Sequence, residues 1–274
     1  MILSGRHSDK AHAPIRLRAL GLCAALVFAF GLAAPANAAC RLALALALDV
    51  SGSVNAREYR QQTHGIARAL GDPAVQSVLF QVPEVPVYLA IYEWSAASYQ
   101  RLILDWTPLT GPADVTAVQN SLMAWEREEA PEATGVGAAL EYGAQLMTRA
   151  PLCWDQTLDI SADGKNNDWP LPHRLRSSGR LGTMNVNALV VADDSAETQD
   201  RTYDGVAELS AYFQARIIYG PSAFVEVALG YQDYARAMTQ KLLRELATRP
   251  LGAAPQPPSA DTAPIRAAYA PSRQ

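Results

Sequence analysis

Short apolar segments alternate along the chain with longer segments that carry apolar residues at helical spacing. The segment 41–49 is mostly apolar at odd and even positions alike, as expected of a central strand covered on both faces. Residues 56–70 place apolar or small side chains every three or four positions, which predicts an amphipathic helix. Asn55, with Glu58 three residues later, predicts a capping box at the start of that helix.

The same alternation continues to about residue 248. Further strands are predicted at 85–95, 100–106, 154–161 and 184–192, with a sixth somewhere in 216–227. Further helices are predicted at about 110–126, 136–147, 200–214 and 231–248, with a short one before the fifth strand. This order predicts an α/β fold: a doubly wound, mostly parallel six-stranded sheet with helices on both faces. A hairpin through Ala96 and Ala97 would make one edge strand antiparallel.

Both ends of the chain fall outside this pattern. Residues 1–38 have a basic polar start, an apolar run of 16 residues and the triplet 36-ANA-38, which together predict a secretory signal peptide. The run is short for a membrane span, so an uncleaved anchor is the less favoured interpretation. Cleavage near Ala38 predicts a periplasmic or secreted domain at 39–248 with no transmembrane span. The Pro- and Ala-rich tail 249–274 is expected to be disordered.

Charge and cysteine content narrow the class of partner. Residues 1–38 hold four basic side chains and one acidic side chain, so their removal changes the net charge from −4 to −7. No basic cluster is visible in the sequence, and a nucleic-acid partner is therefore not expected. After cleavage only Cys40 and Cys153 remain. An even pair of cysteines in an oxidising compartment predicts one disulfide.

The first strand ends in 49-DVSGS-53, which places Asp49, Ser51 and Ser53 at alternate positions. A phosphate-binding loop would need several glycines, and this stretch has one. A serine hydrolase would need GxSxG, but Asp49 stands where the first glycine belongs. His64 and His173 remain after cleavage, so the hydrolase interpretation is weakened rather than excluded.

A metal site explains these residue types better. Oxygen atoms of Asp and Ser are hard ligands suited to Mg²⁺, Mn²⁺ or Ca²⁺, and alternate positions of an extended segment point the same way. Three oxygens are too few for an octahedral cation. Thr134, at the start of a helix, and Asp163, at the end of the fourth strand, are candidates for the remaining positions. Helix capping by Ser53 and Thr134 is the alternative, but it does not account for Asp163.

DxSxS, a lone Thr before a helix and a strand ending in Asp-Gly resemble the von Willebrand factor type A domain over about residues 40–247. The resemblance implies a metal-ion-dependent adhesion site built from Asp49, Ser51, Ser53, Thr134 and Asp163. It implies that the hydroxyls coordinate the cation directly, and that the carboxylates act largely through water. The segments 39-ACRLALALALDVSGSV-54, 92-YEWS-95 and 160-ISADGKNN-167 resemble more closely an uncharacterised family of exported bacterial proteins.

The same resemblance implies a partner. An Asp or Glu of an unknown protein ligand would complete the coordination of the cation, for which Mg²⁺ is expected and Mn²⁺ and Ca²⁺ are alternatives. A metal-dependent hydrolase of phosphate esters and a purely structural metal stay open. An enzyme needs a positioned general base or a second metal, and the sequence places neither beside the site. No catalytic residue is therefore assigned.

Polar residues near the site have competing interpretations. Asn166, Asn167, Asp168 and Trp169 follow Asp163, and they are expected either to line the rim where a partner docks or to form a turn. Asp159 lies two alternations below the strand end, about 13 Å away. We expect it to be a buried structural carboxylate.

Cysteine spacing adds a geometric expectation. Cys40 lies nine residues before Asp49, and Cys153 lies ten before Asp163. If the two strands are adjacent and parallel with their aspartates level, the cysteines are nearly level at the opposite end, where a disulfide is geometrically reasonable. On the entropic model it would add roughly 4 kcal/mol of stability by closing a loop of over 100 residues.

Overall fold

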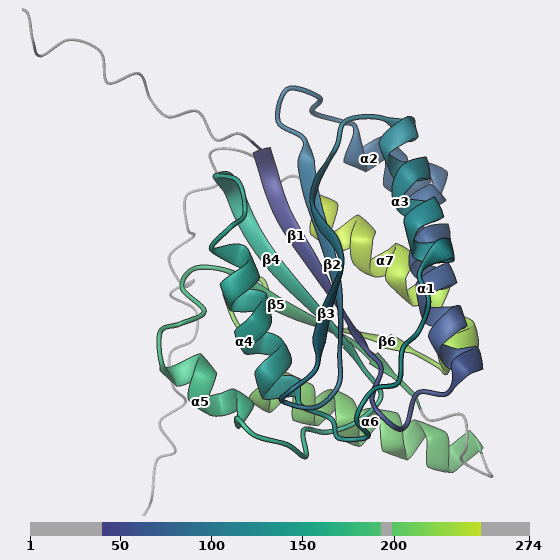
Figure 1. Ribbon diagram of the computed structural model, residues 1–274, viewed down its shortest axis with the longest axis vertical. Coiled ribbons are helices and arrows are strands. Elements are labelled where there is room, and N and C mark those ends of the chain that lie inside the picture. The colour runs from purple at the N-terminus through teal and green to yellow at the C-terminus, as the bar shows by residue number, and fades with distance from the viewer. Residues whose placement is uncertain (1–39, 193–198, 248–274) are drawn as a thin grey trace, which may run out of the picture. The chain divides into compact units, whose positions relative to one another are not determined.

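The structure, a computed structural model, describes residues 40–192 and 199–247, except for the side chains of 199–204. The predicted signal peptide at 1–38 and the predicted tail at 249–274 lie outside the described residues. The predicted α/β architecture is confirmed for the part that is described (Figure 1).

A six-stranded sheet has the order β3-β2-β1-β4-β5-β6. Its strands are β1 (Cys40–Asp49), β2 (Val87–Trp94), β3 (Gln100–Leu109), β4 (Cys153–Ala162), β5 (Asn185–Val191) and β6 (Val225–Ala228). All neighbours pair in parallel except β3, which pairs antiparallel with β2 at one edge. The first strand of the chain therefore lies inside the sheet, between β2 and β4, and its carboxyl end faces the side where ligands of such sheets bind.

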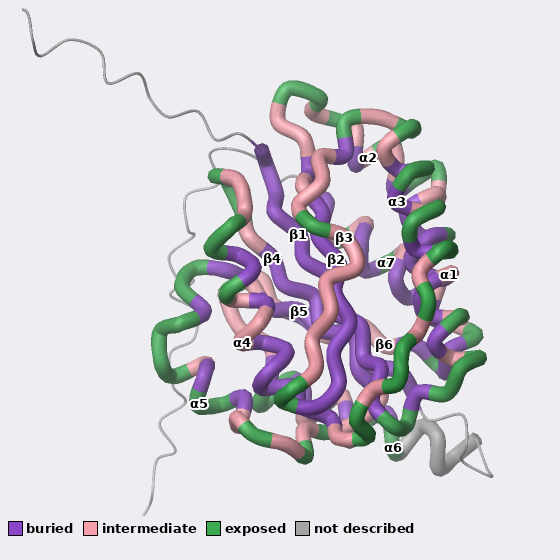
Figure 2. Tube along the Cα trace, in the orientation of Figure 1, coloured by how far each residue is buried: buried purple, intermediate pink, exposed green. Residues whose placement is uncertain are grey.

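Helices cover both faces of the sheet (Figure 1). One face carries α1 (Ala56–Gly71), α2 (Pro73–Leu79), α3 (Pro112–Ala124) and α7 (Tyr234–Leu246). The other carries α4 (Val136–Met147), α5 (Pro172–Ser177) and α6 (Gln199–Arg216). Leu44 and Leu46 of β1 pack into the first layer, whereas Ala43 and Ala45 pack into the second. This explains why β1 is apolar at both parities, and Figure 2 shows it buried along its length.

Two local elements differ from the prediction. The short helix α2 was not predicted, because Asp72 and Pro73 look like a stop signal for α1. In the structure Asp72 also starts the next helix: its Oδ1 accepts a hydrogen bond from Ala74 N at 2.8 Å, and Pro73 occupies the first turn. The last helix begins with a separate 3-10 turn, η1 (Tyr231–Asp233), which sequence periodicity does not resolve.

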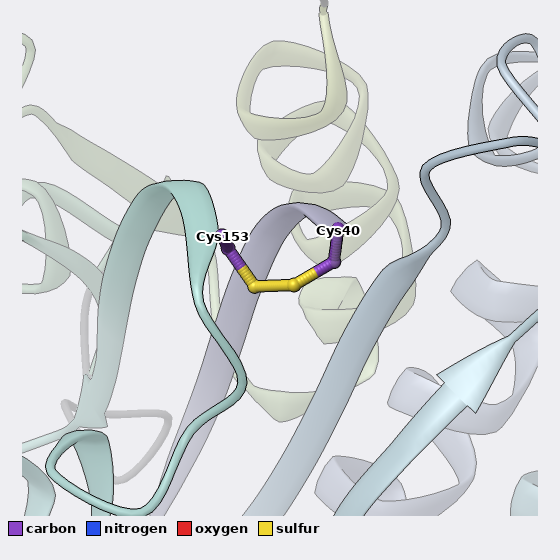
Figure 3. Close-up of a disulfide and its surroundings, with 2 residues drawn as sticks. All are labelled: Cys40 and Cys153. Carbon is purple, nitrogen blue, oxygen red and sulfur yellow. A yellow bond between two sulfur atoms is a disulfide. The ribbon is translucent and has the colours of Figure 1, made fainter. Parts of the chain in front are cut away.

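The predicted disulfide joins Cys40 and Cys153 (Figure 3). The two residues are direct partners in the parallel pairing of β1 with β4, and their Cα atoms are 4.5 Å apart. The bridge links positions separated by 113 residues. It lies at the opposite ends of these strands from Asp49 and Ala162, as the cysteine spacing predicts.

Candidate metal centre

Asp49 ends β1 as a fully buried carboxylate. Its Oδ1 accepts a hydrogen bond from Ser51 N at 2.8 Å, so the chain turns immediately after the strand and brings the Ser51 side chain back toward the sheet. Its Oδ2 is buried and has no hydrogen-bond partner in the described residues. A buried carboxylate oxygen without a donor is costly, and a cation next to this atom would offset that cost.

Hydroxyl groups from two parts of the chain meet above this carboxylate. Ser51 Oγ lies 3.3 Å from Ser53 Oγ and 3.4 Å from Thr134 Oγ1. Ser53 Oγ donates to Asp163 Oδ1 at 2.6 Å. The five residues predicted from the sequence therefore lie in one cluster at the carboxyl ends of β1 and β4 and at the start of α4.

The two carboxyl groups of the cluster, those of Asp49 and Asp163, have raised pKa values. Burial and, to a lesser extent, the nearby charge of Asp163 together raise the pKa of Asp49 to about 8, although hydrogen bonding with Ser51 lowers it. Burial also raises the pKa of Asp163, whereas its hydrogen bonds with Ser53 and Tyr231 lower it. No Lys or Arg side chain pairs with either carboxylate in the part of the chain that the structure describes. A bound cation would supply the missing positive charge.

The donor set fits a hard cation. It consists of three hydroxyl and two carboxylate groups, which suit Mg²⁺, Mn²⁺ or Ca²⁺ better than softer metals. Within the described ranges, no group of three or more His, Cys, Asp or Glu side chains is placed to hold a metal. Neither His64 nor His173 hydrogen-bonds to the cluster among the described residues.

Capping does not explain Ser53 or Thr134. The capping box at α1 is confirmed, but it is formed by Asn55 and Glu58. The residue that precedes α4 is Gly135, so Thr134 lies outside the cap and its hydroxyl faces Ser51. The hydroxyls of Ser53 and Thr134 therefore face the cluster rather than helix termini.

The loop after Asp163 holds Thr134 in place. Asn167 Oδ1 accepts a hydrogen bond from Thr134 N at 2.8 Å, and Asn167 N donates to Thr134 O at 3.0 Å. Asn166 Oδ1 accepts from Gly137 N at 3.0 Å. A Cβ atom at Gly137 would lie 1.8 Å from the carbonyl oxygen of Pro170, so only glycine permits this contact between the loop and α4. The two asparagines thus fix the positions of Thr134 and of the first residues of α4.

Asp168 and Trp169 behave differently from the asparagines. Asp168 Oδ2 accepts from Ala97 N at 2.8 Å, which ties the loop to the β2–β3 hairpin, while its Oδ1 accepts from Trp169 N at 2.7 Å. The Trp169 side chain remains 56% exposed, and the guanidinium of Arg174 lies 4.9 Å from the centre of its ring. Of the four predicted rim residues, Trp169 is the one that presents a large apolar surface.

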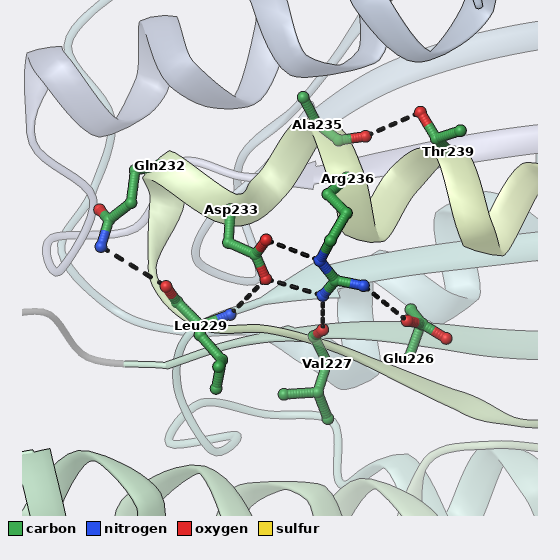
Figure 4. Close-up of polar contacts among 8 residues, drawn as sticks. All are labelled: Glu226, Val227, Leu229, Gln232, Asp233, Ala235, Arg236 and Thr239. Carbon is green, nitrogen blue, oxygen red and sulfur yellow. Dashed lines mark hydrogen bonds and ion pairs between the residues drawn. The ribbon is translucent and has the colours of Figure 1, made fainter.

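Tyr231 was missed by the sequence analysis of the site. Its hydroxyl donates to Asp163 Oδ2 at 3.1 Å from the η1 turn, far away in sequence. Figure 4 shows how this turn is fixed: Arg236 Nε and Nη2 each lie 2.7 Å from a carboxylate oxygen of Asp233, and Nη2 also donates to Val227 O at 3.0 Å. Asp233 Oδ2 in turn accepts from Leu229 N at 3.0 Å. No local sequence pattern indicates this contact.

Asp159 is buried as predicted, with an unexpected partner. Its Oδ1 lies 3.0 Å from Nζ of Lys241, which is fully buried on α7 and also pairs with Glu245 at 2.6 Å. Lys241 lies on the buried face of α7, together with Tyr234, Ala237 and Met238. Asp159 therefore belongs to a structural ion cluster, four residues before Asp163 of the candidate metal centre.

The chain matches a family model and has the fold of several solved structures. A family model described as "Protein of unknown function (DUF1194)" matches residues 39–250. No curated protein matches the sequence. Among solved structures, pilus adhesin SpaC from Lactobacillus rhamnosus GG is 13% identical with a TM-score of 0.52, over 76% of this chain and 30% of that chain. The von Willebrand factor type A structure from Catenulispora acidiphila is also 13% identical, with a TM-score of 0.51, over 77% of this chain and 44% of that chain.

These solved structures are longer than the matched region, which spans less than half of either chain. At this low sequence identity the similarity establishes only a shared fold, which is that of a von Willebrand factor type A domain. None of the helices in the described ranges is long and apolar enough to cross a membrane. Because the family model covers most of the sequence, the chain belongs to the DUF1194 family.

Proposed function

We propose that Asp49, Ser51, Ser53, Thr134 and Asp163 bind a divalent cation and, through it, an acidic side chain of a protein partner. Mg²⁺ is the expected cation, with Mn²⁺ and Ca²⁺ as alternatives. The observation that carries the proposal is the buried Oδ2 of Asp49, which has no donor among the described residues although three hydroxyls gather beside it. The bound cation would supply the positive charge that attracts a partner carboxylate.

The side chains of the cluster would have distinct roles. Ser51, Ser53 and Thr134 would offer neutral hydroxyl oxygens to the cation. Asp163 accepts a hydrogen bond from Ser53 at 2.6 Å and would orient that hydroxyl, while Asp49 would balance charge from beneath. Because the hydroxyls carry no charge, a cation held mainly by them keeps its attraction for an anionic ligand.

Trp169 is the favoured rim contact for the partner. It is 56% exposed on the loop that braces Thr134, and exposed tryptophans are frequent energetic anchors of protein interfaces. A role in adhesion is consistent with the likeness to the pilus adhesin SpaC, although this chain matches only 30% of it. Export is supported by the Cys40–Cys153 disulfide, because such bonds persist in oxidising compartments.

Titration calorimetry with Mg²⁺, Mn²⁺ and Ca²⁺ tests the metal site. Asp49→Ala and Asp163→Ala are expected to abolish binding, because each removes a carboxylate of the cluster. Asp155→Ala is the matched control, since Asp155 is an exposed aspartate at the other end of β4. Circular dichroism would verify that each variant is folded. Wild-type affinity in folded Asp49→Ala and Asp163→Ala would contradict the metal site.

A further inference from the structure

A cleft of about 360 Å³ lies between α1 and the start of α7, beside the metal centre. Its walls are formed by one face of α1 and by the η1 turn with the first residues of α7. Tyr231 belongs to both sites, because it lines the cleft and donates a hydrogen bond to Asp163. The cleft therefore adjoins the candidate metal centre through Tyr231.

The α1 wall is strongly basic. Arg57, Arg60, His64 and Arg68 line the cleft, at spacings of three, four and four residues, which place them along one helix face. The sequence-based expectation of no basic cluster was wrong here. These residues are separated by uncharged and acidic neighbours in the sequence, and only helical periodicity brings them together.

The three arginines make no side-chain contact within the domain that accounts for them. Their side chains are exposed and form no ion pair, hydrogen bond or ring contact with any of the described residues. No Asp or Glu belongs to the described lining of the cleft. Glu58, the acidic residue at the start of the same helix, is engaged with Asn55 N at 2.8 Å. Positive charge is thus concentrated on one surface of a chain whose net charge is −4.

The spacing of the arginines along α1 matches the length of a short extended peptide. Eleven residues of helix separate Arg57 from Arg68, which corresponds to about 16 Å along the axis. An extended peptide covers that length with about five residues and presents side chains of one face at intervals of about 6.6 Å. The base of the cleft is close-packed, because a Cβ atom at Gly65 would lie 2.7 Å from the Tyr234 ring. The exposed arginine side chains stand at the rim of the cleft.

We propose that this cleft binds an extended acidic segment of the partner protein, next to the carboxylate that the metal takes. The inference deepens the proposed function and rests on it for the identity of the partner as an acidic protein. Charge complementarity and the shared residue Tyr231 support this occupant. Opposite charges at the rim of an interface chiefly accelerate association and select the partner, so binding in the cleft should weaken as salt rises.

Fluorescence anisotropy with a labelled peptide that alternates glutamate and serine tests the cleft. The double variant Arg60→Gln/Arg68→Gln is expected to weaken binding about tenfold, as the loss of two exposed ion pairs implies. Arg216→Gln is the matched control, because Arg216 is an exposed helical arginine outside the cleft. A peptide that alternates glutamine and serine should not bind, and the wild-type affinity should fall with added salt.

Three results would overturn the proposal: equal affinities of the double variant and the wild type, equal weakening by Arg216→Gln, or equal binding of the neutral peptide. Tighter binding of inorganic phosphate or of a single-stranded oligonucleotide than of the acidic peptide would also overturn it. Chelation of divalent cations separates the two proposals. If only the metal site is wrong, the chelator leaves the peptide affinity unchanged, but Arg60→Gln/Arg68→Gln still weakens binding. If only the cleft is wrong, the chelator weakens binding, but Arg60→Gln/Arg68→Gln leaves it unchanged.

Discussion

Lys241 offers a sharp test of how the core tolerates charge. Its side chain is fully buried, with Nζ 3.0 Å from Asp159 Oδ1 and 2.6 Å from Glu245 Oε1. Glu245 also accepts a hydrogen bond from Asn187 Nδ2 at 2.6 Å. Lys241→Met would keep an unbranched apolar side chain beside the Phe224 ring, which Nζ approaches to 4.7 Å. It would leave two buried carboxyl groups without their cation.

The expected cost depends on pH. Burial raises the pKa of Asp159 to about 7 although Lys241 lowers it. A carboxyl whose pKa is higher in the folded than in the unfolded protein contributes its full stabilisation below the pKa of the unfolded state. That contribution is lost as the pH rises through the pKa of the folded state. A rise from the ordinary value of 3.8 to about 7 amounts to about 4 kcal/mol lost between pH 4 and pH 7. Without Lys241 the pKa of Asp159 rises further, and the loss continues above pH 7.

Urea unfolding at pH 5 and pH 8 measures this effect. At pH 8 Lys241→Met should lower the free energy of unfolding by about 3–5 kcal/mol, as expected when one partner of a buried ion pair is removed. At pH 5 the cost should be smaller, because Asp159 is protonated in both proteins. The double variant Asp159→Asn/Lys241→Met should recover part of the loss at pH 8. An equal cost at both pH values would refute the reasoning.

Three further variants test other parts of the structure. Replacing Cys40 and Cys153 together by serine should lower the free energy of unfolding by about 2–5 kcal/mol, and reductant should bring the wild type to the same denaturant midpoint. Glu93→Gln should cost about 2–3 kcal/mol in urea unfolding, because this buried carboxylate accepts four side-chain hydrogen bonds. Gly137→Ala should displace the bracing loop and lower the Mg²⁺ affinity in calorimetry, whereas Gly111→Ala, where a Cβ meets nothing within 4 Å, should not.

Much of the fold could be predicted because its elements are strongly patterned. β1 is apolar on both parities, since leucines face one helical layer and alanines the other. The hairpin between β2 and β3 is local, and so are the cap of Asn55 and the motif from Asp49 to Ser53. The helix α2 has only seven residues, too few for its periodicity to stand out from the stop signal that precedes it.

The contacts that complete the site depend on tertiary structure. Asn167 braces Thr134 from 33 residues away, and Tyr231 reaches Asp163 across 68 residues. Neither of these separations in sequence follows from the periodicity of a helix or a strand. The burial of Lys241 could have been predicted from its spacing, because it lies seven residues after Tyr234, on the same helix face. A lysine on an apolar face needs a buried anion, and Asp159 was already expected to be a buried carboxylate.

Strand register connects the disulfide to the candidate metal centre. Cys40 pairs with Cys153, and the same register continues to Ala47 opposite Ile160, which brings the ends of β1 and β4 level. A slip of one residue would turn each side chain to the other face and would carry Asp163 away from Ser53. Packing already selects this register, because a slip would also drive the leucines of β1 into the layer that holds its alanines. The bridge therefore stabilises a register that the core specifies independently. It follows that the serine variant of both cysteines should lose stability and yet retain its affinity for the cation wherever it remains folded.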